Sequence, residues 1–99
     1  MGKKEEYQAK VEAQLKKWGV ELEELKAKAA KATAGAKAEL NKQIEILKAR
    51  QDVAQKKLKE LKAASGEAWK DVKTGLEKTV ADLKEAWSGA LSRFRKKAE

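Results

Sequence analysis

The chain has 99 residues, carries a net charge of +8 and contains neither cysteine nor histidine. Disulfides, thiolate nucleophiles and cysteine-ligated zinc sites are therefore excluded, and the commonest general base and metal ligand is missing as well. We expect no enzymatic activity, no cofactor, no metal and no small-molecule substrate. Because 40% of the residues are charged and none is proline, the composition is typical of long helices or coiled coils.

The N-terminal sequence MGKKEEYQAK lacks the apolar segment of a secretory signal. The longest uncharged run, residues 86–92, is far too short to cross a bilayer. We therefore expect a cytoplasmic location.

Residues 1–64 should form one long helix or two helices with a break at 33–35. Apolar residues recur every three or four positions from Tyr7 to Ala29, which predicts an amphipathic helix. In the alanine-rich stretch 27–40, either Thr33-Ala34-Gly35 forms a turn, or small residues continue the stripe through a slightly bent helix. We favour the continuous helix, because alanine is the best helix former and no Pro, Asn or Asp supports a turn. A turn about residue 34 would instead give the pairs Leu25–Ile44, Leu22–Leu47 and Val11–Leu58.

One apolar stripe follows this whole segment, and we predict that it is buried by association with other helices. Gln51 occupies an interior position of the stripe, where a polar residue usually fixes the register or the number of partners. The stripe consists of Val11, Leu15, Trp18, Leu22, Leu25, Leu40, Ile44, Leu47, Leu58 and Leu61.

Ser65-Gly66 is the strongest break in the chain, since glycine suits the left-handed conformation at a helix end. Residues 65–99 after this turn should form a C-terminal amphipathic helix. Its apolar residues repeat every eleven positions, which is three turns of an almost straight helix. We predict that they form a self-association face or a lipid-binding face: Trp69, Val72, Leu76, Val80, Leu83, Trp87, Leu91 and Phe94.

These elements predict an all-α fold, in which long amphipathic helices form a helical hairpin or antiparallel coiled coil that is oligomeric. A hairpin at Ser65-Gly66 would leave residues 1–33 as an overhang, and a second chain would have to cover its stripe. The expected pairs within the hairpin are Val72–Leu58, Leu83–Leu47, Trp87–Ile44 and Leu91–Leu40.

The segments YQAKVEAQLKKW, QIEILKARQDVAQKKLKELKAASGEAWKDVKTGLE and ALSRF resemble a family of short bacterial coiled-coil proteins labelled as stress-response proteins. The resemblance covers nearly the whole chain, and ASGEAWKDVKTGLE is its most distinctive part. It implies a helical, non-enzymatic protein with an association to stress, and it supplies no catalytic residues. A weaker likeness links the eleven-residue repeat to late-embryogenesis-abundant and apolipoprotein-like helices.

Three functions are compatible with these features. The first is a non-enzymatic scaffold that self-associates into a homo-oligomer. The alternative is a peripheral protein whose C-terminal stripe enters an anionic membrane surface. The third is weak, non-specific binding of nucleic acid, which we consider the least favoured because only three of the 24 basic residues are arginines. In the last two cases the anion contacts would come from Arg93, Arg95, Lys96 and Lys97.

Overall fold

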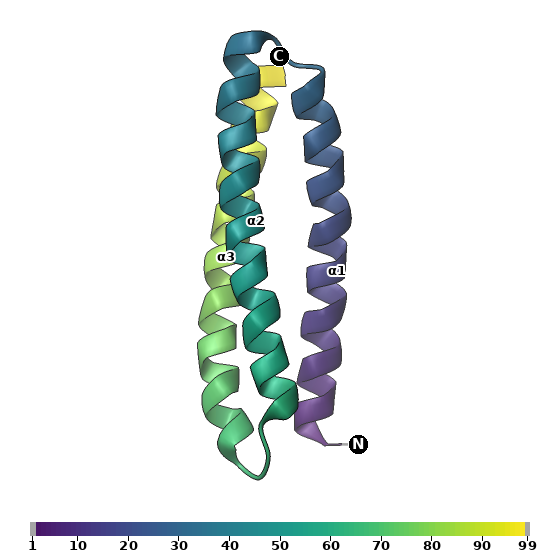
Figure 1. Cartoon of the computed structure of the whole chain (residues 1–99), viewed down its shortest axis with the longest axis vertical. Helices are drawn as coiled ribbons and strands as arrows, with labels where there is room; N and C mark the ends of the chain where they lie inside the picture. The colour runs from purple at the N-terminus through teal and green to yellow at the C-terminus, as the bar shows by residue number, and fades with distance from the viewer. Residues whose placement is uncertain (1, 99) are drawn as a thin grey trace.

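The computed structural model describes residues 2–98, together with the side chains of residues 2–95. Three helices make up this part of the chain: α1 spans Lys3–Ala30, α2 spans Ala34–Ala63 and α3 spans Ala68–Ala98. They run side by side along a rod of 52 × 19 × 17 Å, with α2 antiparallel to both α1 and α3 (Figure 1). The all-α prediction is therefore confirmed, but the arrangement is a three-helix bundle and not a hairpin.

The preferred continuous helix through residues 27–40 is wrong, because α1 ends at Ala30 and α2 begins at Ala34. Thr33 has an extended backbone, and its carbonyl accepts the Lys37 N–H at 2.7 Å, which opens α2. The turn precedes the predicted site, and Gly35 lies in the first turn of α2. A continuous helix would keep the high propensity of alanine but leave the α1 stripe in water. Turning back buries that stripe, and tertiary packing outweighs propensity.

The expected overhang of residues 1–33 is also wrong, because α1 packs along α2 within the same chain. Side-chain contacts join α1 and α2 at two levels of the bundle. Gln51 Nε2 of α2 donates to the Leu15 carbonyl of α1 at 3.2 Å, and Lys62 forms an ion pair with Glu12. The α1 stripe therefore has a cover that does not require a second chain.

The second connection lies between Ala63 and Ala68, around the predicted break. Gly66 has a φ of 61°, which confirms its left-handed conformation. Near this end of the bundle, Lys4 of α1 donates through Nζ to the carbonyl of Ala64, just after α2. A positive side chain at the C-terminal end of a helix is favourable, because the carbonyls there have no partner within the helix.

A single core fills the space between the three helices. Each helix contributes residues at spacings of three and four, so that one face of each points inward. The buried residues are Val11, Leu15, Trp18, Leu22, Leu25 and Ala29 of α1, Leu40, Ile44, Leu47, Ala54, Leu58 and Leu61 of α2, and Leu76, Leu83, Trp87, Ala90 and Phe94 of α3.

Candidate functional site

The two stripes predicted as association faces lie mainly in this core. All ten residues of the stripe in 1–64 are buried. In the C-terminal stripe, Leu76, Leu83, Trp87 and Phe94 are buried, and Trp69, Val72 and Val80 are half-buried. Leu91 is 42% exposed, while its neighbour Ala90 is buried. Leu91 follows Lys84 by seven residues and therefore lies on the same flank of α3.

The two tryptophans Trp18 and Trp87 join α1 to α3 across the core. Their ring centroids are 6.5 Å apart and their planes differ by 10°, so the rings are stacked. Aromatic pairs at such separations add to the stability gained from burial alone. This pair bridges the two helices whose backbones approach each other least.

An open groove runs between α1 and α3. Its volume is about 360 Å³. The groove has apolar and charged side chains from both helices, namely Tyr7, Lys10, Val11 and Gln14 of α1, and Glu77, Val80, Ala81 and Lys84 of α3. Because α1 and α3 both pack mainly on α2, their facing flanks are left partly open.

One end of the groove holds a lysine between two aromatic rings. Lys73 Nζ lies 5.2 Å from the centroid of the Tyr7 ring and 6.0 Å from that of Trp69, within the range of cation–π attraction. Lys73 Nζ also lies 3.6 Å from Glu77 Oε1. Burial raises the pKa of the Tyr7 hydroxyl above its ordinary value, and the negative charge of Glu77 raises it further.

Two other lysines border the groove. Lys10 of α1 and Lys84 of α3 are both exposed, and neither forms an ion pair with another residue that the structure describes. Since Glu77 already faces Lys73, the groove keeps a positive balance. This arrangement has the chemistry to hold a small anion beside an apolar surface.

A second exposed feature lies on the outer edge of α2. Ile46 and Val53 are 38% and 49% exposed, and their separation of seven residues places them on one line of the helix. The same line continues to Lys57, whose Nζ lies 3.7 Å from the position of a Cβ built on Gly75 of α3. This edge of α2 therefore borders α3, on the side of the bundle away from the α1–α3 groove.

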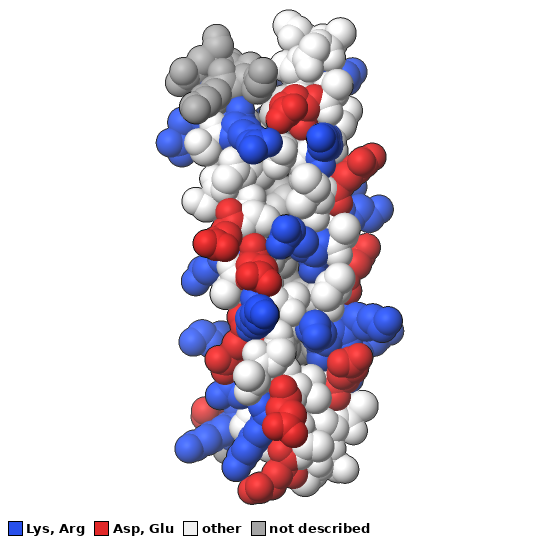
Figure 2. All heavy atoms as spheres, turned by 90° about the vertical axis from the view of Figure 1, so that its left-hand side faces the viewer, with Lys and Arg blue, Asp and Glu red and all other residues white. Residues whose placement is uncertain are grey.

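The basic cluster at the C-terminus is only partly available for anions. Arg93 Nη1 lies 3.2 Å from Glu39 Oε1 of α2, so its charge is balanced within the chain. Arg95 is exposed, and the side chains of Lys96 and Lys97 lie outside those that the structure describes. Along the face formed by α2 and α3, basic and acidic side chains alternate and do not gather into a patch of one sign (Figure 2).

Among the described residues, no cluster of three or more His, Cys, Asp or Glu side chains is suited to hold a metal ion. In the same part of the chain, no helix has the length and apolar character needed to cross a bilayer. Comparisons of the chain with protein-family models, curated proteins and solved structures found no match. The resemblance to bacterial coiled-coil proteins therefore stays a prediction.

Sequence reasoning missed the groove. Its residues Lys10, Gln14, Glu77, Ala81 and Lys84 have the polarity and spacing of solvent-exposed helix positions. The sequence carried no local signal for it, because a groove depends on which two flanks face each other. The exposed pair Ile46 and Val53 had a signal, since both residues fall off the main stripe of α2.

Proposed function

We propose that this chain is a non-enzymatic helical scaffold that self-associates through the outer edge of α2. The observation that carries the proposal is the pair Ile46 and Val53. The three stripes cover one another, and four large apolar side chains stay exposed among the described residues: Val20, Ile46, Val53 and Leu91. Of these, Ile46 and Val53 are the two that share a line on one helix.

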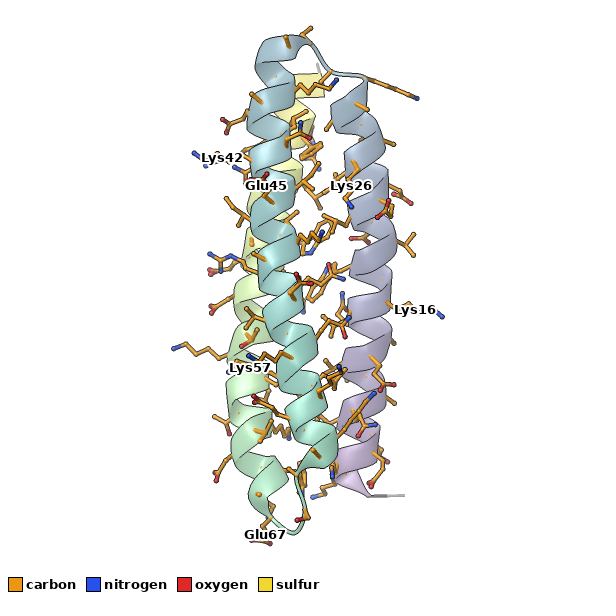
Figure 3. All side chains as sticks on the ribbon, viewed as in Figure 1. Lys16, Lys26, Lys42, Glu45, Lys57 and Glu67 are labelled. Atoms are coloured by element: carbon orange, nitrogen blue, oxygen red, sulfur yellow. The ribbon has the colours of Figure 1, made fainter. Side chains whose placement is uncertain are left out.

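An antiparallel second copy fits this line. With the twofold axis between Ala49 and Arg50, Ile46 of one copy lies opposite Val53 of the other, and the contact occurs twice by symmetry. Lys42, which points away from the bundle (Figure 3), then lies opposite Lys57 of the second copy and about one turn from its Glu60. Lys42 and Glu60 are exposed, so Glu60 offsets the repulsion between the two lysines in this register.

Other functions have less support from the fold. Insertion of the C-terminal stripe into lipid would require α3 to leave the bundle, because Leu76, Leu83 and Trp87 are buried. The alternating charges on the α2–α3 face give little concentration of positive potential for nucleic acid (Figure 2). The link to stress rests only on the resemblance in the sequence.

Sedimentation velocity over a wide range of protein concentration tests the proposal. We expect the wild-type chain to dimerise, and Ile46→Glu/Val53→Glu to stay monomeric while keeping its helical circular dichroism. The matched control is Val20→Glu/Ala27→Glu, which adds the same charge at the same spacing on the exposed side of α1. A wild-type chain that is monomeric at every concentration, or a control that dissociates equally, would overturn the proposal.

A charge exchange tests the register separately. Glu60→Lys should weaken the dimer, because Lys42 then meets lysines at positions 57 and 60 of the other copy, twice by symmetry, and adding Lys42→Glu should restore it. If the second change weakens the dimer further, the antiparallel arrangement about Ala49 and Arg50 is wrong.

A further inference from the structure

The groove between α1 and α3 has an apolar surface next to two lysines that form no ion pair with another described residue. Val11 and Val80 supply aliphatic surface, and the ring of Tyr7 adds an aromatic wall. Lys10 and Lys84 stand on opposite helices at the rim. We propose that this groove binds a small monoanionic amphiphile: a carboxylate whose apolar body lies between the helices and whose charge meets the two lysines.

The size of the groove fits such a ligand. A volume of about 360 Å³ lies at the lower end of the range for small-molecule sites. The lining residues extend from Tyr7 to Gln14 on α1 and from Glu77 to Lys84 on α3, which corresponds to about 10 Å along each helix. An apolar body of about two helical turns fills this length, as in a medium-chain fatty acid.

The charges favour an anion over other occupants. Glu77 is the acid that lines the groove, and Lys73 lies 3.6 Å from it. The remaining charges on the lining, Lys10 and Lys84, are both positive. Lysine also presents an aliphatic stem, so it can cover the body of a ligand while its ammonium group meets the head.

A second copy of the chain is a poorer occupant. The rim of the groove carries Lys10 and Lys84, so a docked helix would have to present acidic side chains to both. A docked helix would also extend far beyond the two turns that the groove spans. The outer edge of α2, with Ile46 and Val53, is a separate surface from this groove. Ligand binding and dimerisation can therefore be tested independently.

The first experiment is a titration of the full chain with octanoate and octylammonium below their micellar concentrations and with octanol below its solubility limit, followed by amide NMR shifts. We expect saturable one-to-one binding of octanoate, with shifts centred on Tyr7, Val11 and Val80. Octanol should bind about tenfold more weakly, since it lacks the ion pairs, and octylammonium should bind less than octanol.

Two sets of variants assign the site. Lys10→Gln/Lys84→Gln should weaken octanoate binding about tenfold and leave octanol unchanged, whereas the control Lys16→Gln/Lys48→Gln should change neither. Lys16 points outward from α1 (Figure 3). Ala81→Phe should fill the groove and abolish binding, while Ala13→Phe, at an exposed position outside the groove lining, should not.

Equal affinity for octanoate and octanol would overturn the proposal, as would octanoate binding that survives both Lys10→Gln/Lys84→Gln and Ala81→Phe. Binding only to vesicles of anionic lipid, with no response to free octanoate, would also overturn it in favour of a membrane surface. The titration is repeated with Ile46→Glu/Val53→Glu, which should stay monomeric. Unchanged octanoate binding by this variant would show that the groove binds its ligand whether or not the chain dimerises.

Discussion

Gln51 shows how one polar side chain can set the alignment of two helices. Its Nε2 donates to the Leu15 carbonyl at 3.2 Å, and a Cβ built on Gly19 would lie 3.4 Å from the same nitrogen. Gly19 therefore leaves the surface of α1 open where Gln51 approaches. Shifting α2 by one turn would leave this half-buried amide without its acceptor, at a cost of about 0.5–1.5 kcal/mol. We infer that Gln51 helps to specify the register of α1 against α2.

Two buried polar atoms, from Gln51 and Trp87, lie in the otherwise apolar core. Gln51 Oε1 and Trp87 Nε1 are buried and form no hydrogen bond with another described residue. The Gln51 oxygen can only accept a hydrogen bond, and the Trp87 nitrogen can only donate one. Neither atom therefore gains hydrogen-bond energy from the described residues around it. The tryptophan ring therefore contributes mainly through its burial and its stacking on Trp18.

The titration of Tyr7 tests the lower end of the α1–α3 groove. It is the chain's one tyrosine, so phenolate absorbance reports it alone. We expect its pKa to lie above the ordinary value of 10.0, because burial and then Glu77 disfavour the phenolate. The folded-state pKa is the higher one, so Tyr7 contributes stability below pH 10, which is lost as the pH rises through the raised pKa.

Glu77→Gln separates the two causes of this shift. The pKa of Tyr7 should fall in that variant yet stay above 10.0, since burial is the larger cause and remains. Glu24→Gln, on an exposed part of α1, should leave the titration unchanged. A wild-type pKa at or below 10.0 would show that the Tyr7 ring is not packed as the structure has it.

Of the two connections between the helices, the sequence predicted one clearly and the other poorly. Gly66 predicted the connection between α2 and α3, because glycine adopts a left-handed backbone without strain. The φ of Gly66 is indeed 61°. The first, at residues 31–33, has a lysine, an alanine and a threonine with ordinary negative φ at Lys31 and Thr33. Such a turn has no local signature, and it forms because α1 gains a partner. A prediction from helix propensity alone therefore favours one continuous helix through residues 27–40, where the structure has two helices.

Two glycine substitutions compare these local requirements directly. Gly66→Ala should destabilise the bundle by about 1–2 kcal/mol, because alanine is strained in the left-handed region. Gly89→Ala should stabilise it by about 0.5–1 kcal/mol, because Gly89 lies inside α3 where alanine is the better helix former. A Cβ meets no neighbouring atom within 4 Å at either position, so crowding plays no part.

Urea unfolding at equal protein concentration measures both changes. The two variants should shift the midpoint in opposite directions. A stabilising Gly66→Ala would mean that the second connection does not hold its glycine in the left-handed conformation.

At the scale of the whole molecule, periodicity predicted which residues are buried but not which helices cover them. The stripes on α1 and α2 are buried as a set, since an apolar face must leave water wherever a partner can be found. The choice between an oligomeric hairpin and a single three-helix bundle depends on the turn at 31–33, and so does the groove. Leu91 shows the limit of the pattern. It continues the stripe in sequence, yet it is 42% exposed while its neighbour Ala90 is buried.

The stack of Trp18 on Trp87 distinguishes the bundle from the hairpin, because only a folded-back α1 brings these rings together in one chain. Trp18→Leu and Trp87→Leu should each lower the free energy of unfolding by about 1–3 kcal/mol. Their effects should fall short of additivity by about 0.5–1.5 kcal/mol, the coupling expected for an aromatic pair 6.5 Å apart.

Trp18→Leu combined with Trp69→Leu supplies the control for this cycle. Trp69 precedes Trp87 by eighteen residues, about 27 Å along α3, so this pair should be additive within error. Urea unfolding at a low and a high protein concentration measures all five variants beside the wild type. Coupling between Trp18 and Trp87 that is equal at both concentrations places the contact within one chain. Coupling that vanishes on dilution would mean that α1 is covered by another copy, and a coupling of zero throughout would mean that α1 and α3 do not share a core.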